Sequence, residues 1–193
     1  MRNGNSADHG PLVTNVVAGL IGGLAASWTM EQFQRALGRL SEEMRGAEGG
    51  GGQQHRKPQS EPATYKAADA IAHTVTGEDV PKDDKPAAGS LVHYAFGGAV
   101  GAIYGAAAAR TPDVTSWAGM PFGATVWLIA DEMGVPLAGL SKKPTEYPLS
   151  DHLSAFATHL VYGMTTECVR RTLVHLTGAD RREPHQMQLQ LEA

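Results

Sequence analysis

The chain has 193 residues and a formal net charge of -4, and 23 of its residues are glycine. This length suits one domain or one small helical bundle, and the charge gives no reason to expect a nucleic-acid partner. The mean hydropathy of -0.23 is that of a soluble protein, but it averages over an uneven chain. Residues 11–30 and 86–109 contain no Asp, Glu, Lys or Arg, whereas residues 38–88 are crowded with charge and glycine.

The first uncharged stretch, residues 11–30, follows a polar tail at 1–10 and predicts a membrane-spanning helix. Twenty helical residues rise about 30 Å, which matches the hydrocarbon core of a bilayer. A secretory signal peptide with a cleavage site at Ala25-Ala26-Ser27 is the alternative, although Arg2 is the only basic residue in the region before the apolar stretch. Apolar residues keep helical spacing over 31–48, so we expect the helix to continue beyond the membrane or along its surface.

A polar inter-helix segment, residues 38–87, separates this stretch from the next one. Gly49 to Gly52 break the helical pattern, and we expect a flexible linker over 49–66. Residues 67–75 predict a short amphipathic helix that ends at Gly77. The sequence leaves open whether the segment 67–76 lies on the bilayer.

Three further spans are expected, at about 88–109, 115–136 and 151–174, before a polar tail at 176–193. The last of these spans has an uncharged centre of only fifteen residues, His152 to Thr166, so a buried helix of a soluble protein is its alternative. The fold class we predict is all-α, an integral membrane bundle of about four transmembrane helices within residues 11–175. The basic cluster after the last span favours cytoplasmic termini.

Small residues recur every four positions along each predicted span, and residues four apart share a helix face. Such faces let helices approach closely in lipid, as in GxxxG motifs. We therefore expect the glycines of these faces to mediate helix packing. These packing glycines are Gly19, Gly23, Gly97, Gly101, Gly105, Gly119, Gly123 and Gly163.

Each face of small residues also carries or approaches an ionisable residue. Four of these ionisable residues form a candidate intramembrane proton or ion network. Charged groups inside a membrane cost free energy and usually face partners or water, so they should point into the bundle. Ordinary explanations exist for most of them: an interfacial histidine at the start of a span, and an i,i+3 or i,i+4 ion pair between a glutamate and the two arginines that follow it. The four candidates are His93, Asp131, His159 and Glu167.

Familiar catalytic and cofactor motifs are absent from the sequence: there is no Walker loop, GxGxxG, HExxH or GxSxG. We expect no catalytic residues, no enzymatic activity, no cofactor and no dedicated metal site. The spacing of His152 and His159 leaves weak metal binding with Asp131 or Glu167 open. The single Cys168 has no internal disulfide partner and is expected to serve in packing.

Several motifs in the last three spans carry a family resemblance. They are LVHYAFGGA at 91–99, Tyr104-Gly105, WLIADEMGVPLAGL at 127–140, YPLSDH at 147–152 and HLVYGMTTECVRR at 159–171. With these motifs, the chain over roughly 11–175 resembles the YagU-like family of bacterial inner-membrane proteins, a domain family of unknown function. The resemblance implies a multi-pass protein of the bacterial inner membrane and supplies no reaction.

Two functions fit these features. The first is a proton- or ion-linked channel-like or transporter-like module, or a pH-responsive membrane component, because histidine titrates near neutral pH. Four helices leave little room for a pore, so conduction would call for a homo-oligomer. The second is a non-catalytic structural or adaptor protein that assembles through its glycine faces, with a partner membrane protein and the lipid bilayer as its contacts. A membrane enzyme with a metal at His152, His159 and Asp131 is a distant third.

Overall fold

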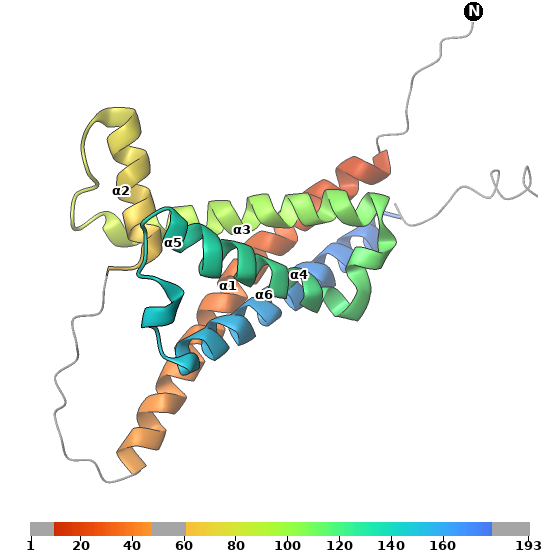
Figure 1. The fold of residues 1–193 in the computed structure, drawn as a ribbon. Helices are drawn as coiled ribbons and strands as arrows, with labels where there is room; N and C mark the ends of the chain where they lie inside the picture. The colour runs from red at the N-terminus through yellow and green to blue at the C-terminus, as the bar shows by residue number, and fades with distance from the viewer. Residues whose placement is uncertain (1–9, 48–60, 179–193) are drawn as a thin grey trace, which may run out of the picture.

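The computed structural model describes residues 10–47 and 61–178, and these fold into helices with no strand among them (Figure 1). The expected all-α fold class is therefore confirmed for this part of the chain. The predicted tails at 1–10 and 176–193 lie outside the described residues except at their inner ends. Most of the predicted linker at 49–66 does as well.

The first helix, α1, runs without a break from Gly10 to Ala47. It is the longest helix of the chain and crosses the others diagonally in Figure 1. Its first two-thirds pack against α3 and α6, and Ala26 and Ser27 are completely buried there.

The second helix, α2, runs from Ala63 to Thr76, four residues earlier than the sequence predicted, so the linker cannot extend to residue 66. It ends as expected at Gly77, whose φ of +80° suits glycine and whose N–H donates to the carbonyl of His73. Helix α2 packs against α3, which runs from Lys85 to Arg110.

The expected span at 115–136 differs from the structure. Residues Pro112–Gly119 form a tight 3₁₀ segment, η1, in which Trp117, Ala118 and Gly119 have left-handed backbone angles. Helix α4 therefore begins only at Met120, and Pro121 lies in its first turn, where the missing N–H is harmless. After Val126 the helix widens into a π-helix, η2, over Trp127–Gly134, followed by α5 at Val135–Leu137.

A short 3₁₀ turn, η3, at Pro144–Glu146 precedes the last helix, α6, which runs from Leu149 to Leu176. Helix α6 packs against α1 and α4. Its C-terminal end lies beside the start of α1 and the end of α3 in Figure 1. Two hydrogen bonds join these ends: Arg170 donates to Asn15 on α1, and Tyr104 on α3 donates to Glu167.

Glycine makes the closest helix contacts. A Cβ on Gly23 would collide with the carbonyl oxygen of Gly97, and one on Gly123 would collide with that of His159. Gly119 is held at φ +80°, and a Cβ there would lie 2.5 Å from the carbonyl oxygen of Gly163. All eight glycines expected to pack lie at such contacts within the chain: Gly19, Gly23, Gly97, Gly101, Gly105, Gly119, Gly123 and Gly163.

Polar side chains are buried in the interior beside a small apolar cluster. The largest fully buried side chains are Glu167, Thr158, Thr166 and Ser27, and the apolar cluster is Ala26, Met30 and Tyr162 with Phe122 and Val126 packed against it. Large apolar side chains are exposed instead along every long helix. Examples are Val17, Leu20, Trp28, Leu91, Ile103, Ile129, Leu153 and Met164.

Two of the described helices are long and apolar enough to cross a membrane: α1, over Pro11–Met44, and α3. Only 39% and 33% of their most apolar windows are buried, which is low for the core helix of a soluble protein. These helices support a membrane location. Neither the segment at 115–136 nor α6 passes the same test, so the four-span bundle remains a prediction.

We expect Gly23→Ala to lower the stability of the bundle by about 1–3 kcal/mol, because two backbones must separate to admit the methyl group. The matched control is Gly38→Ala on the same helix, where a Cβ would meet nothing within 4 Å. There the higher helix propensity of alanine should leave stability unchanged or slightly higher. Thermal unfolding in detergent measures both, and equal midpoints would contradict the close approach.

Candidate functional site

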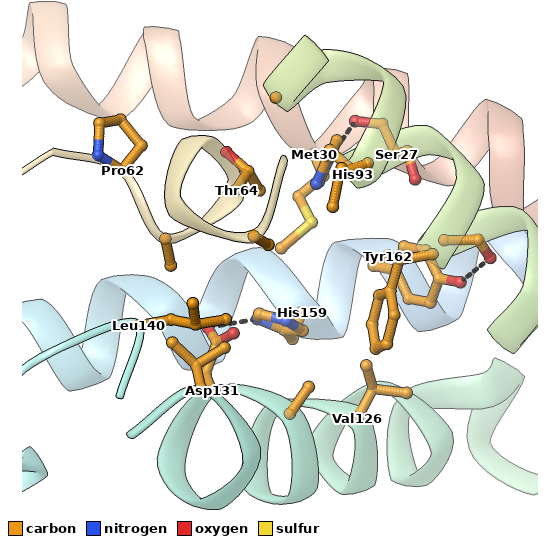
Figure 2. A pocket seen from close by; sticks show the side chains of 18 of the residues that line it. Ser27, Met30, Pro62, Thr64, His93, Val126, Asp131, Leu140, His159 and Tyr162 are labelled. Carbon is orange, nitrogen blue, oxygen red and sulfur yellow. Dashed lines mark hydrogen bonds and ion pairs between the residues drawn. The ribbon is translucent and has the colours of Figure 1, made fainter. Parts of the chain in front are cut away.

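A cavity of about 780 Å³ lies between α1, α2, α3, α6 and the α4–η2–α5 segment (Figure 2). This volume is in the range of small-molecule sites. Most of its lining is apolar, and no Lys or Arg is among the described residues that line it. Six titratable side chains line the cavity: Glu31, Tyr65, His93, Asp131, His159 and Tyr162.

His159 is the best-defined polar group in this cavity. Its ring is 6% exposed, and its Nδ1 lies 2.9 Å from the carbonyl oxygen of Ala155 one turn earlier. Because a carbonyl can only accept, Nδ1 carries a proton in this contact. Asp131 Oδ2 lies 3.7 Å from Nδ1, close enough to stabilise a protonated ring. Figure 2 shows the two side chains facing each other from α6 and η2.

The π-helix η2 presents two adjacent carboxylates to α6. Asp131 faces His159, and Glu132 Oε1 lies 2.7 Å from Nδ1 of His152, two turns earlier on α6. Nε2 of His152 in turn lies 3.0 Å from the carbonyl of Pro144. Both carboxylates therefore reach histidines that share one face of α6.

His93 enters the cavity from α3. Its Nε2 lies 3.4 Å from the carbonyl oxygen of Ser27 on α1, and its ring meets that of Tyr94 edge to face. The hydrogen bond ties α3 to α1, as expected for a structural histidine, while the ring still lines the cavity (Figure 2).

Tyr162 and Ser27 complete the deep end of the cavity. The Tyr162 hydroxyl donates to the carbonyl oxygen of Gly97 at 2.6 Å and so joins α6 to α3 (Figure 2). Ser27 is fully buried, and its Oγ finds no hydrogen-bond partner among the residues that the structure describes. A buried hydroxyl without a partner costs free energy unless something in the cavity binds it. The small-residue series on the first span includes Ser27, but sequence spacing could not assign it to a cavity.

Glu167, the fourth candidate, does not line the cavity. It is 1% exposed and accepts hydrogen bonds from the Tyr104 hydroxyl at 2.9 Å, from Arg170, and from Arg171. Arg170 also donates to Asn15 Oδ1 at 2.6 Å, and Arg171 donates to the Thr115 carbonyl at 3.1 Å. The cluster thereby joins α1, α3, η1 and α6.

Both carboxylate oxygens of Glu167 accept hydrogen bonds from neighbouring side chains. We call Glu167 and these partners the structural lock, because they hold four segments of the chain together. The expected i,i+3 and i,i+4 ion pairs with Arg170 and Arg171 are confirmed. Asn15 and Tyr104 are the partners that spacing along one helix could not supply.

Helix α2 closes one side of the cavity and is held in place by a partly buried ion-pair cluster. Lys85 Nζ lies 2.6 Å from Asp69 and 2.8 Å from Glu61. The hydrogen bond from Lys85 holds the pKa of the Asp69 carboxyl below its usual value. The Tyr65 ring fits over Gly89, where a Cβ would collide with it.

No metal site is formed within residues 10–47 and 61–178, since no three His, Cys, Asp or Glu side chains gather there. The expected alternative of His152 and His159 with Asp131 or Glu167 is wrong for this part of the chain. The two histidines pair with different carboxylates, and Glu167 lies in the separate lock.

We expect Glu167→Gln to destabilise the fold by about 3–5 kcal/mol, since it leaves two guanidinium groups without their shared counter-charge. The control, Arg35→Gln, removes the exposed i,i+4 pair with Glu31 and should change stability by less than about 1 kcal/mol. Denaturant or thermal unfolding in detergent gives both values. If Glu167→Gln changes stability as little as Arg35→Gln does, Glu167 is not a structural lock.

Asp69→Asn should loosen α2 from the start of α3, because the carboxylate partner of Lys85 is lost. Hydrogen exchange of the α2 amides at neutral pH should be faster in this variant than in wild type. The control is Asp79→Asn, whose pair with His73 is exposed.

Acidification should loosen α2 in the same way in the wild-type protein. The lowered pKa of Asp69 means that its stabilising contribution is complete above the unfolded value of about 4 and disappears as the pH falls through the folded value. Unchanged α2 exchange in Asp69→Asn, or at a pH below that range, would show that this ion pair does not hold the helix.

A comparison with protein families gives one match: the model described as "Protein of unknown function (DUF1440)" matches residues 61–168. This range includes α2, α3, the α4–η2–α5 segment and most of α6, and therefore His93, Asp131 and His159. No curated protein and no solved structure matches the chain.

Proposed function

The chain belongs to the DUF1440 family of proteins of unknown function, and from this premise we propose that it is a proton- or ion-linked transporter-like module of a membrane. The observation that carries the proposal is the convergence of His93, Asp131 and His159 on one cavity inside an apolar-surfaced bundle. Within the family, the chain would be one of the YagU-like proteins of the bacterial inner membrane. It would have four spans and cytoplasmic termini.

The polar interior supports the membrane setting of this proposal. Lipid does not drive apolar side chains inward, so a bundle in lipid can enclose serine, threonine and charged pairs and leave leucine and isoleucine outside. The structure of α1 and α3 follows this arrangement, with glycines facing inward and Leu20, Leu91 and Ile103 facing outward.

His159 is the group that would accept and release the proton. The contacts that support this choice are the hydrogen bond from its Nδ1 to Ala155 and the Asp131 carboxylate 3.7 Å away, which would stabilise a charged ring. The other titratable groups on the cavity wall are Glu31 on α1, His93 on α3, Tyr65 on α2 and Tyr162 on α6 itself.

One chain encloses the whole cavity, so the proposal does not depend on an oligomer pore. We had expected four helices to leave little room, but a cavity of about 780 Å³ lies between α1, α2, α3, α6 and the α4–η2–α5 segment. An adaptor function, the second candidate, would need a surface other than the glycine faces, because these are used within the chain. A homo-oligomer or a partner membrane protein would then bind through the exposed apolar side chains.

Proton and cation flux into liposomes that contain the purified protein tests the proposal. We expect flux above that of empty liposomes between pH 5 and 7.5, and a fall of at least several-fold in His159→Ala. The matched control is His175→Ala, which removes an exposed histidine near the end of the same helix and should keep wild-type flux. No flux with folded, inserted protein, or equal flux in both variants, would refute a transport role for His159.

A further inference from the structure

We propose that the cavity beside His159 binds a hydrophobic organic cation, with Asp131 as its counter-ion. The inference rests on the proposed function, because the same cavity would serve both, and it names the substrate class. It follows from the charge, the shape and the lining of the cavity.

The charge of the cavity selects a cation. Two carboxylates, Glu31 and Asp131, line it without a lysine or arginine. Glu31 already pairs with Arg35 outside the cavity at 3.2 Å. Asp131 faces only His159 as an ion-pair partner on the cavity wall, at 3.7 Å, so its charge is available whenever that ring is neutral. An anion would meet no lysine or arginine side chain there.

The lining selects an organic cation over a metal ion. Metal ions such as Ca²⁺ need about six oxygen ligands, and even a small site needs several converging ones. Here one carboxylate stands among apolar and aromatic groups, and no metal-binding set of three forms in the described part of the chain. Phe96, Tyr65 and Tyr162 offer aromatic faces, which attract an organic cation, and Met30 adds a polarisable thioether.

Binding of two probe ions of equal shape and opposite charge tests the inference. The probes are tetraphenylphosphonium and tetraphenylborate, measured by equilibrium dialysis against the full-length protein in detergent at pH 7.5, with empty micelles subtracted. We expect saturable binding of tetraphenylphosphonium, near one per chain, and no saturable binding of tetraphenylborate. Equal binding of both ions would overturn the inference.

Variants assign this binding to the cavity. Asp131→Asn should weaken tetraphenylphosphonium binding at least ten-fold, and Asp131→Glu, which keeps the charge, should restore most of it. The matched control is Glu146→Gln in η3, an exposed carboxylate that does not line this cavity, and this variant should bind as wild type. Unchanged binding in Asp131→Asn would refute the proposed counter-ion.

A second variant keeps the test decisive if Asp131→Asn does not fold. Ala130→Phe fills part of the cavity and leaves Asp131 in place, so it should abolish binding of the cation although the charge remains. Wild-type affinity in Ala130→Phe would place the bound ion elsewhere and overturn the inference.

The two proposals fail separately. Proton flux without tetraphenylphosphonium binding would leave the proposed function standing and remove the organic cation. Saturable, Asp131-dependent binding without any flux would support the cation site and refute transport.

Discussion

The close approach of helix backbones at glycine is the constraint on which the rest of the structure depends. Where Gly23 meets Gly97 and Gly123 meets His159, no side chain separates the helices. Helices this close leave little space for large apolar side chains at these contacts, so serine, threonine and tyrosine lie there, and the hydroxyls of Tyr162 and Thr166 donate to backbone carbonyls. The large apolar side chains are displaced to the outside, where lipid accepts them. The small-residue faces and the polar interior are thus two consequences of one packing geometry.

This geometry divides the polar residues of the bundle between two places with different chemistry. At one end, Glu167 receives hydrogen bonds from tyrosine and arginine side chains and is satisfied in every direction. A group so completely paired stabilises one arrangement of helices and has little freedom to exchange protons. Further along α6, His159 and Asp131 face an open cavity with a 3.7 Å separation and few other partners. The bundle is locked at the first place and can respond to protons or ligands at the second.

Much of this arrangement could be predicted from spacing along single helices, and the rest could not. The all-α class, the glycine positions, the end of α2 at Gly77 and the Glu167 ion pairs follow from periods of three and four residues. Contacts between helices carry no such local signal, so Asn15 and Tyr104 could not be assigned to Glu167, and Ser27 could not be assigned to a cavity. The structure differs from the span predicted at 115–136 for another reason. Its apolar composition predicts a continuous helix, whereas close contact between Gly119 and Gly163 forces a left-handed turn, and the helix beyond it widens into a π-helix.

The π-helix explains why the titratable cavity lies where it does. A π-helical stretch places more residues in each turn than an α-helix and often marks a functional site. Over Trp127–Gly134 it allows Asp131 and Glu132 to reach His159 and His152 from one surface, although neighbours in a regular α-helix point about 100° apart. Glu132 and His152 bond at 2.7 Å and hold η2 against α6. Asp131 therefore remains at the looser position, beside the cavity. The tight pair holds the helix in place, so the looser pair keeps the freedom that proton exchange or cation binding needs.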